Sequence, residues 1–184
     1  MNAPAQFLSI AGQVAVVTGA YGKLGRVWVA ALEQAGAKVA KLDLPQAIDD
    51  TGFAVDITNR ASLEAARLAI EQKLGPVSIL INNAGIDQPP GPAKTYRLEE
   101  FPADVFRQVL DVNVVGAFLC MQVFGQGMCE RKQGSIINIG SLYASVSSDE
   151  RFYNHLATDP AFLKPPAYGA SKAALVQLTK HFAT

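Results

Sequence analysis

The sequence has no excess of either charge and few cysteines. Among its 184 residues, 16 Lys and Arg balance 16 Asp and Glu, so the formal net charge is zero. It contains no basic stripe of the kind that binds nucleic acid, and no basic amphipathic stretch typical of a membrane surface. We therefore expect a small-molecule partner, and neither nucleic acid nor a membrane.

Cysteine usage and the lack of long apolar runs indicate in which cellular compartment the protein is expected. Cys120 and Cys129 lie in one expected helix without the spacing of a metal site or a disulfide framework. They are interpreted as reduced thiols, and no metal is expected. No uninterrupted apolar run approaches the length that spans a bilayer, and residues 1–12 lack the regions of a signal peptide. These absences predict a soluble, cytoplasmic protein.

Short apolar runs alternate with amphipathic stretches along the whole chain. Strands are expected at 13–18, 37–43, 52–56, 77–81 and 135–139. Helices are expected at 26–35, 60–74 (with Thr58 as N-cap), 103–131 and from about 168. Continuous β-branched runs suit strands buried on both faces, and their alternation with helices predicts a doubly wound, parallel α/β sheet of Rossmann type. The length fits one domain, taken as 1–184.

A glycine turn follows the first expected strand. Gly19, Gly22 and Gly25 come after Thr18 and lead into a helix. Glycines let the backbone approach a pyrophosphate, and the helix N-terminus supplies N–H groups, so this context predicts a dinucleotide site. Asp43 ends the second expected strand, where a carboxylate accepts from an adenosine 2′-hydroxyl and repels a 2′-phosphate. It predicts NAD over NADP, although a plain strand-end Asp is the alternative.

Tyr168 and Lys172 stand four positions apart, on one face of an expected helix. An ammonium one turn from a phenol favours the phenolate, and such a Tyr can act as a general acid or base. The pair alone also occurs by chance in many helices. However, ligands of doubly wound sheets bind beyond the carboxyl ends of the strands, where Asp43, Asn82 and Ser141 are expected. One crevice could hold them all.

In these motifs the chain resembles the short-chain dehydrogenase/reductase family, from about residue 12 to its end. The matching residues occur in the family's order: Thr18-Gly19 with Gly22 and Gly25, Asp56, Asn82-Asn83-Ala84-Gly85, Asn113, Ser141, and Tyr168 with Lys172. The resemblance implies an NAD(H)-dependent oxidoreductase that interconverts a secondary alcohol and a carbonyl. It implies cofactor contacts at Thr18, Gly19, Gly22, Leu24, Gly25, Asp43, Asp56, Ile57, Asn83, Ala84, Gly85, Tyr168 and Lys172.

The resemblance also implies a role for each catalytic residue. Tyr168 would exchange the hydroxyl proton, and Lys172 would tune it and bind the nicotinamide ribose. Ser141 would hydrogen-bond the substrate oxygen, Asn113 would position a water that links Lys172 to solvent, and Asp56 would bind the adenine amino group. From the residues alone, Ser141 could instead cap a helix, and Asn113 could be a buried kink residue.

The glycine spacing departs from the shorter branch of the family. The middle glycine is Gly22, and Lys23 takes the place where that branch has its glycine. The resulting Gly-x-x-Gly-x-x-Gly pattern is more typical of the extended, sugar-nucleotide branch, and it leaves open whether Tyr21 or Lys23 contacts the cofactor. This spacing suggests a first alternative, a sugar-nucleotide epimerase or dehydratase with tightly bound NAD. A separate alternative is a non-catalytic dinucleotide sensor.

The segment between Ser141 and Tyr168 is about twice as long as the family's usual spacing. Its polar residues are Ser147, Ser148, Asp149, Glu150, Arg151, Tyr153, Asn154 and His155. Their polarity suggests a hydroxyl-rich substrate such as a sugar or polyol. A solvated loop or a subunit contact would account for them equally well.

The resemblance bears on the end of the chain and on assembly. The chain stops at Thr184, inside the helix that begins near Tyr168. Family members continue with two more strands, so those C-terminal strands are expected to be missing and the domain to be truncated. Relatives pair through the helix at 103–131 and the helix after it, which implies a homodimer or homotetramer.

Overall fold

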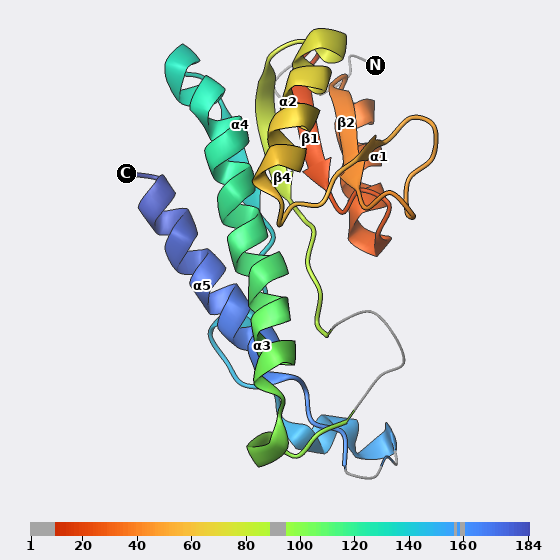
Figure 1. The fold of residues 1–184 in the computed structure, drawn as a ribbon, viewed down its shortest axis with the longest axis vertical. Helices are drawn as coiled ribbons and strands as arrows, with labels where there is room; N and C mark the ends of the chain where they lie inside the picture. The colour runs from red at the N-terminus through yellow and green to blue at the C-terminus, as the bar shows by residue number, and fades with distance from the viewer. Residues whose placement is uncertain (1–9, 89–94, 157, 159–160) are drawn as a thin grey trace, which may run out of the picture. The chain divides into compact units, whose positions relative to one another are not determined.

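The computed structural model describes residues 10–88, 95–156, 158 and 161–184, which form two compact units (Figure 1). The first unit consists of the chain up to Ala84 together with Gly116–Ile139, and it contains the whole sheet. The second unit consists of Gly85–Val115 and Gly140–Thr184. The segment 86–96, whose prolines and glycine predict a loop, falls partly outside the described residues.

The first unit is built on a five-stranded parallel sheet in the order β3-β2-β1-β4-β5. The strands are β1 (Val14–Thr18), β2 (Lys38–Asp43), β3 (Phe53–Ala54), β4 (Val77–Asn82) and β5 (Ser135–Asn138). The chain builds outward from β1 on one side and then crosses to β4 on the other. This order confirms the predicted Rossmann-type sheet and places its switch point between the ends of β1 and β4.

Helices cover both faces of this sheet. Helix α1 (Lys23–Gln34) contacts β1 and β2, over a cluster that includes Ala15, Val17, Ile79 and Ile81. On the other face, α2 (Arg60–Leu74) and α4 (Ala117–Arg131) contact each other, and α4 contacts β4 and β5. Phe124 of α4 is fully buried. Each such large side chain contributes roughly 1.5–3 kcal/mol through burial.

The second unit is mainly helical. Helix α3 (Ala103–Leu110) is followed by the π turn η3 (Asp111–Gly116), and α5 (Pro166–Phe182) contacts α3 and η4. Three short 3-10 turns complete it: η2 (Leu98–Glu100), η4 (Leu142–Ala144) and η5 (Glu150–Leu156). The long segment between Ser141 and Tyr168 therefore contains two of these turns, η4 and η5.

Some predicted boundaries are wrong for identifiable reasons. Asn59, not Thr58, is the N-cap of α2, because its side chain accepts from the Ser62 N–H at 3.1 Å. The Thr58 hydroxyl instead donates to Asp56 at 2.7 Å. Helix α1 begins at Lys23 rather than at 26, directly after Gly22. The helix predicted at 103–131 is interrupted by η3, whose β-branched valines and Gly116 have low helix propensity.

Two further features concern apolar character. By length and composition, the helical run Ala103–Arg131 is long and apolar enough to span a membrane, and half of its apolar stretch is buried. Both cysteines are unpaired, as predicted; Cys120 is buried and Cys129 is exposed. Burial raises the pKa of the Cys120 thiol to about 12, so this thiol stays protonated at neutral pH.

Candidate functional site

The ends of β1 and β4 are joined by the side chain of Thr18. Its hydroxyl donates to the Ile81 carbonyl at 3.4 Å and accepts from the N–H groups of Asn83 and Ala84, both at 3.1 Å. Thr18 is almost completely buried. A hydroxyl with one donor and two acceptor positions is fully used in this arrangement. Thr18 therefore holds the turn after β4 against the glycine turn after β1.

Asn83 reinforces the same junction. Its side-chain amide donates to the carbonyls of Thr18 and Gly19, both at 3.0 Å. Its side-chain oxygen accepts from the Trp28 indole at 3.2 Å. Asn83 thereby links β4, the glycine turn and α1, so its predicted place at the cofactor site coincides with a structural role.

Two glycines of the turn leave no room for a side chain. A Cβ on Gly25 would lie 2.0 Å from the Gly19 carbonyl oxygen. Gly19 itself has a φ of +62°, and a Cβ there would lie 2.9 Å from the Ala84 Cα. Gly22 is less restricted, with the nearest atom at 3.2 Å. The close approach between α1 and the turn accordingly depends on Gly19 and Gly25.

The N-terminus of α1 suits an anionic group. Gly22 caps the helix without a side-chain hydrogen bond, and its first turn carries no acidic residue. Backbone N–H groups and the positive end of the helix dipole therefore remain for a phosphate. Leu24 in this turn is 55% exposed, although leucine usually lies inside. These features fit the pyrophosphate of a dinucleotide.

Asp43 ends β2 and contacts the glycine turn. One carboxylate oxygen accepts from the Tyr21 N–H at 3.0 Å, and the other accepts from the Leu44 N–H at 2.9 Å. The Tyr21 hydroxyl donates to Asp49 at 2.6 Å. Asp49 has its pKa lowered to about 2, through hydrogen bonds from Thr51 and then from Tyr21. Two carboxylates thus lie beside the turn.

Asp56 and Ile57 follow β3. Asp56 is exposed, and one of its oxygens accepts from the N–H and the hydroxyl of Thr58 at 2.9 and 2.7 Å. Ile57 is buried. The predicted contact between Asp56 and an adenine amino group stays a prediction. We call the first unit's residues Thr18, Gly19, Gly22, Leu24, Gly25, Asp43, Asp56, Ile57, Asn83 and Ala84 the glycine-loop set.

Asn113 is buried in the π turn of the second unit. Its side-chain oxygen accepts from the Ile86 N–H at 2.8 Å. Its side-chain amide donates to the Ile86 carbonyl at 2.8 Å and to the Ser171 hydroxyl at 2.9 Å. Asn113 therefore joins the segment after Gly85 to α5, and it lies buried within the π turn.

Lys172 lies one turn beyond Tyr168 on α5, as its spacing predicts. Its ammonium is 5.7 Å from the centre of the Tyr168 ring, and the residue is only 5% exposed. Burial lowers the pKa of Lys172, because a low-dielectric surrounding disfavours its charge. A Cβ on Gly85 would lie 3.8 Å from the Lys172 ammonium and 3.2 Å from the Asn113 oxygen. These three residues consequently meet.

Ser141 caps the 3-10 turn η4, as the alternative interpretation predicted. Its hydroxyl oxygen accepts from the Tyr143 N–H at 3.2 Å. The Tyr143 ring lies edge-on to the Tyr168 ring, with centroids 6.4 Å apart, and a Cβ on Gly169 would lie 3.1 Å from the Tyr143 carbonyl. The turn that starts at Ser141 thus packs directly on the Tyr168 turn of α5. We call Gly85, Asn113, Ser141, Tyr168 and Lys172 the tyrosine set.

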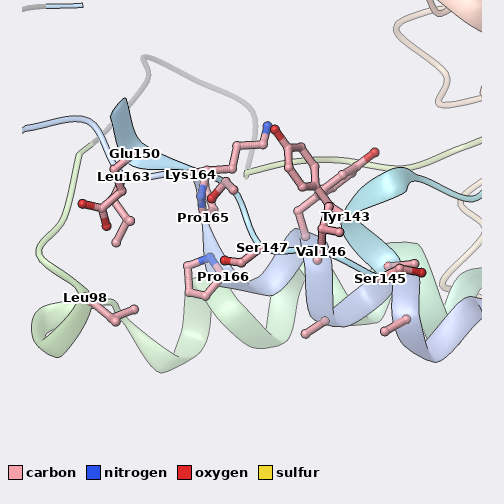
Figure 2. A pocket seen from close by; sticks show the side chains of 16 residues that line it. Leu98, Tyr143, Ser145, Val146, Ser147, Glu150, Leu163, Lys164, Pro165 and Pro166 are labelled. Atoms are coloured by element: carbon pink, nitrogen blue, oxygen red, sulfur yellow. The ribbon is translucent and has the colours of Figure 1, made fainter. Parts of the chain in front are cut away.

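A cavity of about 490 Å³ lies within the second unit, with Tyr168 in its wall. Its other polar residues are Tyr143, Ser145, Ser147, Ser148, Glu150 and Lys164. In Figure 2, Lys164 and Tyr143 extend toward the same side of the cavity, while Glu150 and Leu163 lie together at another part of the wall. The long segment before Tyr168 therefore supplies most of the cavity's polar groups.

Sequence reasoning missed three residues of this cavity region: Tyr143, Lys164 and Asp87. The Tyr143 hydroxyl is 3.1 Å from that of Tyr153, and this hydrogen bond is the main cause that raises the pKa of Tyr153 to about 12. The Lys164 ammonium lies 5.2 Å from the Tyr168 ring centre and pairs with Asp87. One available signal was the Lys-x-x-x-Tyr-x-x-x-Lys spacing, but Lys164 precedes the helix.

The predicted site residues fall into two sets, one in each unit. The glycine-loop set gathers at the carboxyl ends of β1, β2 and β4, with Asp56 and Ile57 after β3. Within the tyrosine set, the Asn113 and Lys172 side chains both lie close to Gly85, and the turn after Ser141 packs on Tyr168. That one crevice holds both sets stays a prediction. Within the described ranges, no group of three or more His, Cys, Asp or Glu residues is arranged to hold a metal ion.

Comparisons with known proteins place these motifs in a family context. Residues 13–184 match the family model described as short chain dehydrogenase. The chain is similar to a galactitol 2-dehydrogenase of Rhizobium johnstonii, with 31% identity over 184 residues that cover 94% of this chain and 65% of the relative. It is also similar to an NAD-dependent glycerol dehydrogenase of Listeria innocua, with 28% identity over 182 residues that cover 94% of this chain and 64% of the relative.

A solved structure resembles the fold as well. The crystal structure of gox2181 has a TM-score of 0.77 and 28% sequence identity, and the match covers 96% of this chain and 68% of that one. The chain spans about 65% of the length of the two curated relatives. The comparison thus covers nearly all of this chain and about two thirds of each similar protein.

Proposed function

This chain belongs to the short-chain dehydrogenase/reductase family, and on that premise we propose that it is an NAD(H)-dependent oxidoreductase. It interconverts a secondary alcohol and a carbonyl on a sugar-like or polyol-like substrate. The observation that carries the proposal is Tyr168, which lines a polar cavity and has the buried ammonium of Lys172 one helical turn away. NAD supplies the hydride chemistry when it is bound.

Tyr168 moves the proton in the proposed reaction. In the oxidation direction its phenolate accepts the substrate's hydroxyl proton, and in the reduction direction its phenol returns that proton to the carbonyl oxygen. The positive charge of Lys172 stabilises the phenolate. Because Lys172 is buried, its charge is poorly screened by solvent, which strengthens its effect on the neighbouring ring.

Ser141 and Asn113 support this transfer in different ways. The hydrogen bond from the Tyr143 N–H occupies one lone pair of Ser141, so the Ser141 O–H can donate to the substrate oxygen. The Asn113 side chain is committed to Ile86 and Ser171. We propose that a backbone carbonyl of the π turn binds the water that links Lys172 to solvent. A carbonyl is available there because a π turn interrupts the regular hydrogen-bond ladder.

The glycine-loop set is proposed to bind the cofactor. The first turn of α1 presents N–H groups for the pyrophosphate, and Gly19 and Gly25 permit close approach of the backbone. Asp43 accepts from the ribose hydroxyls and, with Asp49, disfavours the 2′-phosphate of NADP. The Listeria relative is named as NAD-dependent, which supports NAD over NADP.

A hydroxyl-rich substrate is supported by two observations. The cavity presents three serine hydroxyls, a carboxylate and an ammonium beside Tyr168. The two relatives named above act on galactitol and glycerol by their names. Polar groups that would be left unpaired by an apolar alcohol discriminate strongly in favour of a hydroxylated one.

Assembly and compartment complete the proposal. We propose a homodimer or homotetramer in the cytoplasm, as in the family pattern. Sedimentation of the purified protein tests the assembly, and a sedimenting species with the mass of one chain would contradict it.

The proposal is tested by the nicotinamide absorbance during turnover. The protein is assayed with NAD and with NADP on galactitol, glycerol and xylitol, and on apolar secondary alcohols. We expect oxidation of polyols with NAD and a loss of at least about 100-fold in kcat for Tyr168→Phe. NAD that co-purifies with the protein and does not exchange with free NAD would favour the epimerase alternative. If Tyr168→Phe left the protein's function intact, the sensor alternative would be favoured.

A further inference from the structure

We infer that Lys164, held in place by its ion pair with Asp87, recognises a second hydroxyl group of the substrate, on the carbon next to the reacting one. The inference rests on the proposed function and deepens it, because it names the residues that select a vicinal diol. It concerns a lysine and a carboxylate that lie outside the set of residues implied by the family's motifs.

Lys164 is positioned beside the reacting group. It lines the same cavity as Tyr168, and its ammonium lies 5.2 Å from the centre of the Tyr168 ring (Figure 2). Lys172 is at a similar distance from that ring, 5.7 Å, but it is buried and is not part of the cavity wall. Of the two lysines, Lys164 is therefore the one that a substrate in the cavity can touch.

Asp87 gives this lysine a fixed place. One oxygen of Asp87 accepts from the Lys164 ammonium. The other oxygen is buried and has no hydrogen-bond partner within the part of the chain that the structure describes. A buried carboxylate oxygen without a donor is unusual, because such groups are nearly always hydrogen-bonded. Because that oxygen is buried and Asp87 does not line the cavity, its role is to hold the Lys164 ammonium in place rather than to meet the substrate.

The chemistry of the pair matches a hydroxyl group. The ammonium has three N–H donors and Asp87 uses one of them, so the others can donate to a substrate oxygen. A hydroxyl group on the substrate can accept such a hydrogen bond. The pair carries no net charge, and Glu150 in the same wall disfavours an anionic substrate. An uncharged polyol therefore fits this part of the cavity.

The position of Lys164 relative to Tyr168 determines which hydroxyl group of the substrate it binds. The oxygen held by Tyr168 belongs to the reacting carbon, and the Lys164 ammonium lies close to the same ring. A hydroxyl on the neighbouring carbon is near the reacting oxygen, so one short substrate can reach both groups. A monohydric alcohol reaches Tyr168 alone and makes no hydrogen bond with Lys164.

Two alcohols that differ only in this hydroxyl provide the test. The value of kcat/KM with NAD is measured for butane-2,3-diol and butan-2-ol, with the wild-type protein and with Lys164→Met. We expect Lys164→Met to lower kcat/KM for the diol by about 10- to 100-fold, as for loss of a hydrogen bond to a charged group. The value for butan-2-ol should change by less than about 2-fold, because this alcohol makes no such bond.

Two further variants separate recognition from structure. Asp87→Asn keeps the shape of the side chain but removes its charge, and we expect it to reduce the preference for the diol in the same direction. Arg151→Met is the matched control, because Arg151 forms an exposed ion pair with Asp149 in the same segment and is absent from the cavity wall. Arg151→Met should leave the ratio of the two alcohols unchanged.

Each outcome bears on one claim. If Lys164→Met leaves the ratio of the two alcohols at its wild-type value, whether or not both values fall, the pair only ties two segments together and the inference is overturned. If the wild-type protein oxidises neither alcohol nor any polyol, the proposed function fails, and the inference fails with it. Thermal unfolding of each variant shows whether a fall in both values reflects a loss of folded protein.

Discussion

The glycine-loop set and the tyrosine set build their sites by different means. In the first unit the geometry is carried by backbone: Gly25 lies against the Gly19 carbonyl, and Thr18 and Asn83 bind main-chain groups at the ends of β1 and β4. In the second unit the geometry depends on side chains from separate segments. Asn113, for example, forms hydrogen bonds with Ile86 and Ser171. We conclude that the first site tolerates few changes in chain shape, whereas the second depends on individual side-chain groups.

The sharpest test of this difference is Gly25→Ala. A Cβ 2.0 Å from a backbone oxygen forces the turn and α1 apart, and we expect the free energy of unfolding to fall by about 3 kcal/mol. NADH binding should weaken by at least about 100-fold, because misplaced N–H groups no longer meet the phosphates. Chemical denaturation and fluorescence titration measure the two effects.

Gly140→Ala is the matched control for that substitution. A Cβ on Gly140 would meet nothing within 4 Å, so stability and NADH binding should stay at their wild-type values. Normal NADH affinity in Gly25→Ala would contradict the role of the close approach. A large loss in Gly140→Ala would show that any added methyl group disturbs this protein.

The corresponding test in the second unit is Asn113→Ala. The substitution leaves the N–H and carbonyl of Ile86 without their side-chain partner, and we expect a loss of about 2–3 kcal/mol. Amide exchange should speed up in α5 and remain slow in β1, where the Thr18 contacts are unchanged. Asn154→Ala, an exposed residue of η5, serves as the control. Faster exchange in β1 than in α5 would contradict the assignment.

Alkaline pH should act on the first unit through Cys120. Burial raises the pKa of this thiol from its ordinary 9.0 to about 12, so the folded state binds a proton that the unfolded state releases. Stability is therefore full below pH 9 and falls between pH 9 and about 12, by at most about 1.4 kcal/mol per pH unit. In Cys120→Ala that component of the slope should vanish, as measured by urea unfolding at several pH values. An unchanged slope would show that Cys120 is not its source.

The substitution Asp43→Asn is expected to have a smaller effect than the changes above, on the choice between NAD and NADP. The amide keeps an acceptor for the Tyr21 N–H and removes the negative charge beside the turn. We expect the ratio of kcat/KM for NAD to that for NADP to fall by about 10-fold, which corresponds to about 1.4 kcal/mol. Asp49 keeps a second carboxylate nearby and limits the change. A wild-type protein that prefers NADP would contradict the role of Asp43 outright.

Sequence reasoning reached further into the first unit than into the second. Continuous apolar runs located β1 and β4 closely, because buried parallel strands have few ways to satisfy their backbone. The spacing of Gly19 and Gly25 located the turn for a different physical reason, the close approach of backbone segments there. Even here, local competition decided details, as when Asn59 rather than Thr58 captured the Ser62 N–H.

The second unit was harder because its contacts join residues distant in sequence. The i, i+4 spacing placed Lys172 beside Tyr168, since both lie on one helix. Nothing in the local pattern placed Asp87 next to Lys164, which is 77 positions away. The π turn at Asn113 also has no clear periodic signal, because it depends on the Ile86 backbone that Asn113 binds.

The central claim is that the glycine-loop set binds the cofactor and Tyr168 carries the chemistry, and one paired measurement tests it directly. NADH affinity and polyol turnover are measured for the wild-type protein and Tyr168→Phe. The account predicts NADH affinity within about 2-fold of wild type and a kcat lower by at least about 100-fold in the variant. A Tyr168→Phe protein that oxidises polyols at the wild-type rate would contradict it.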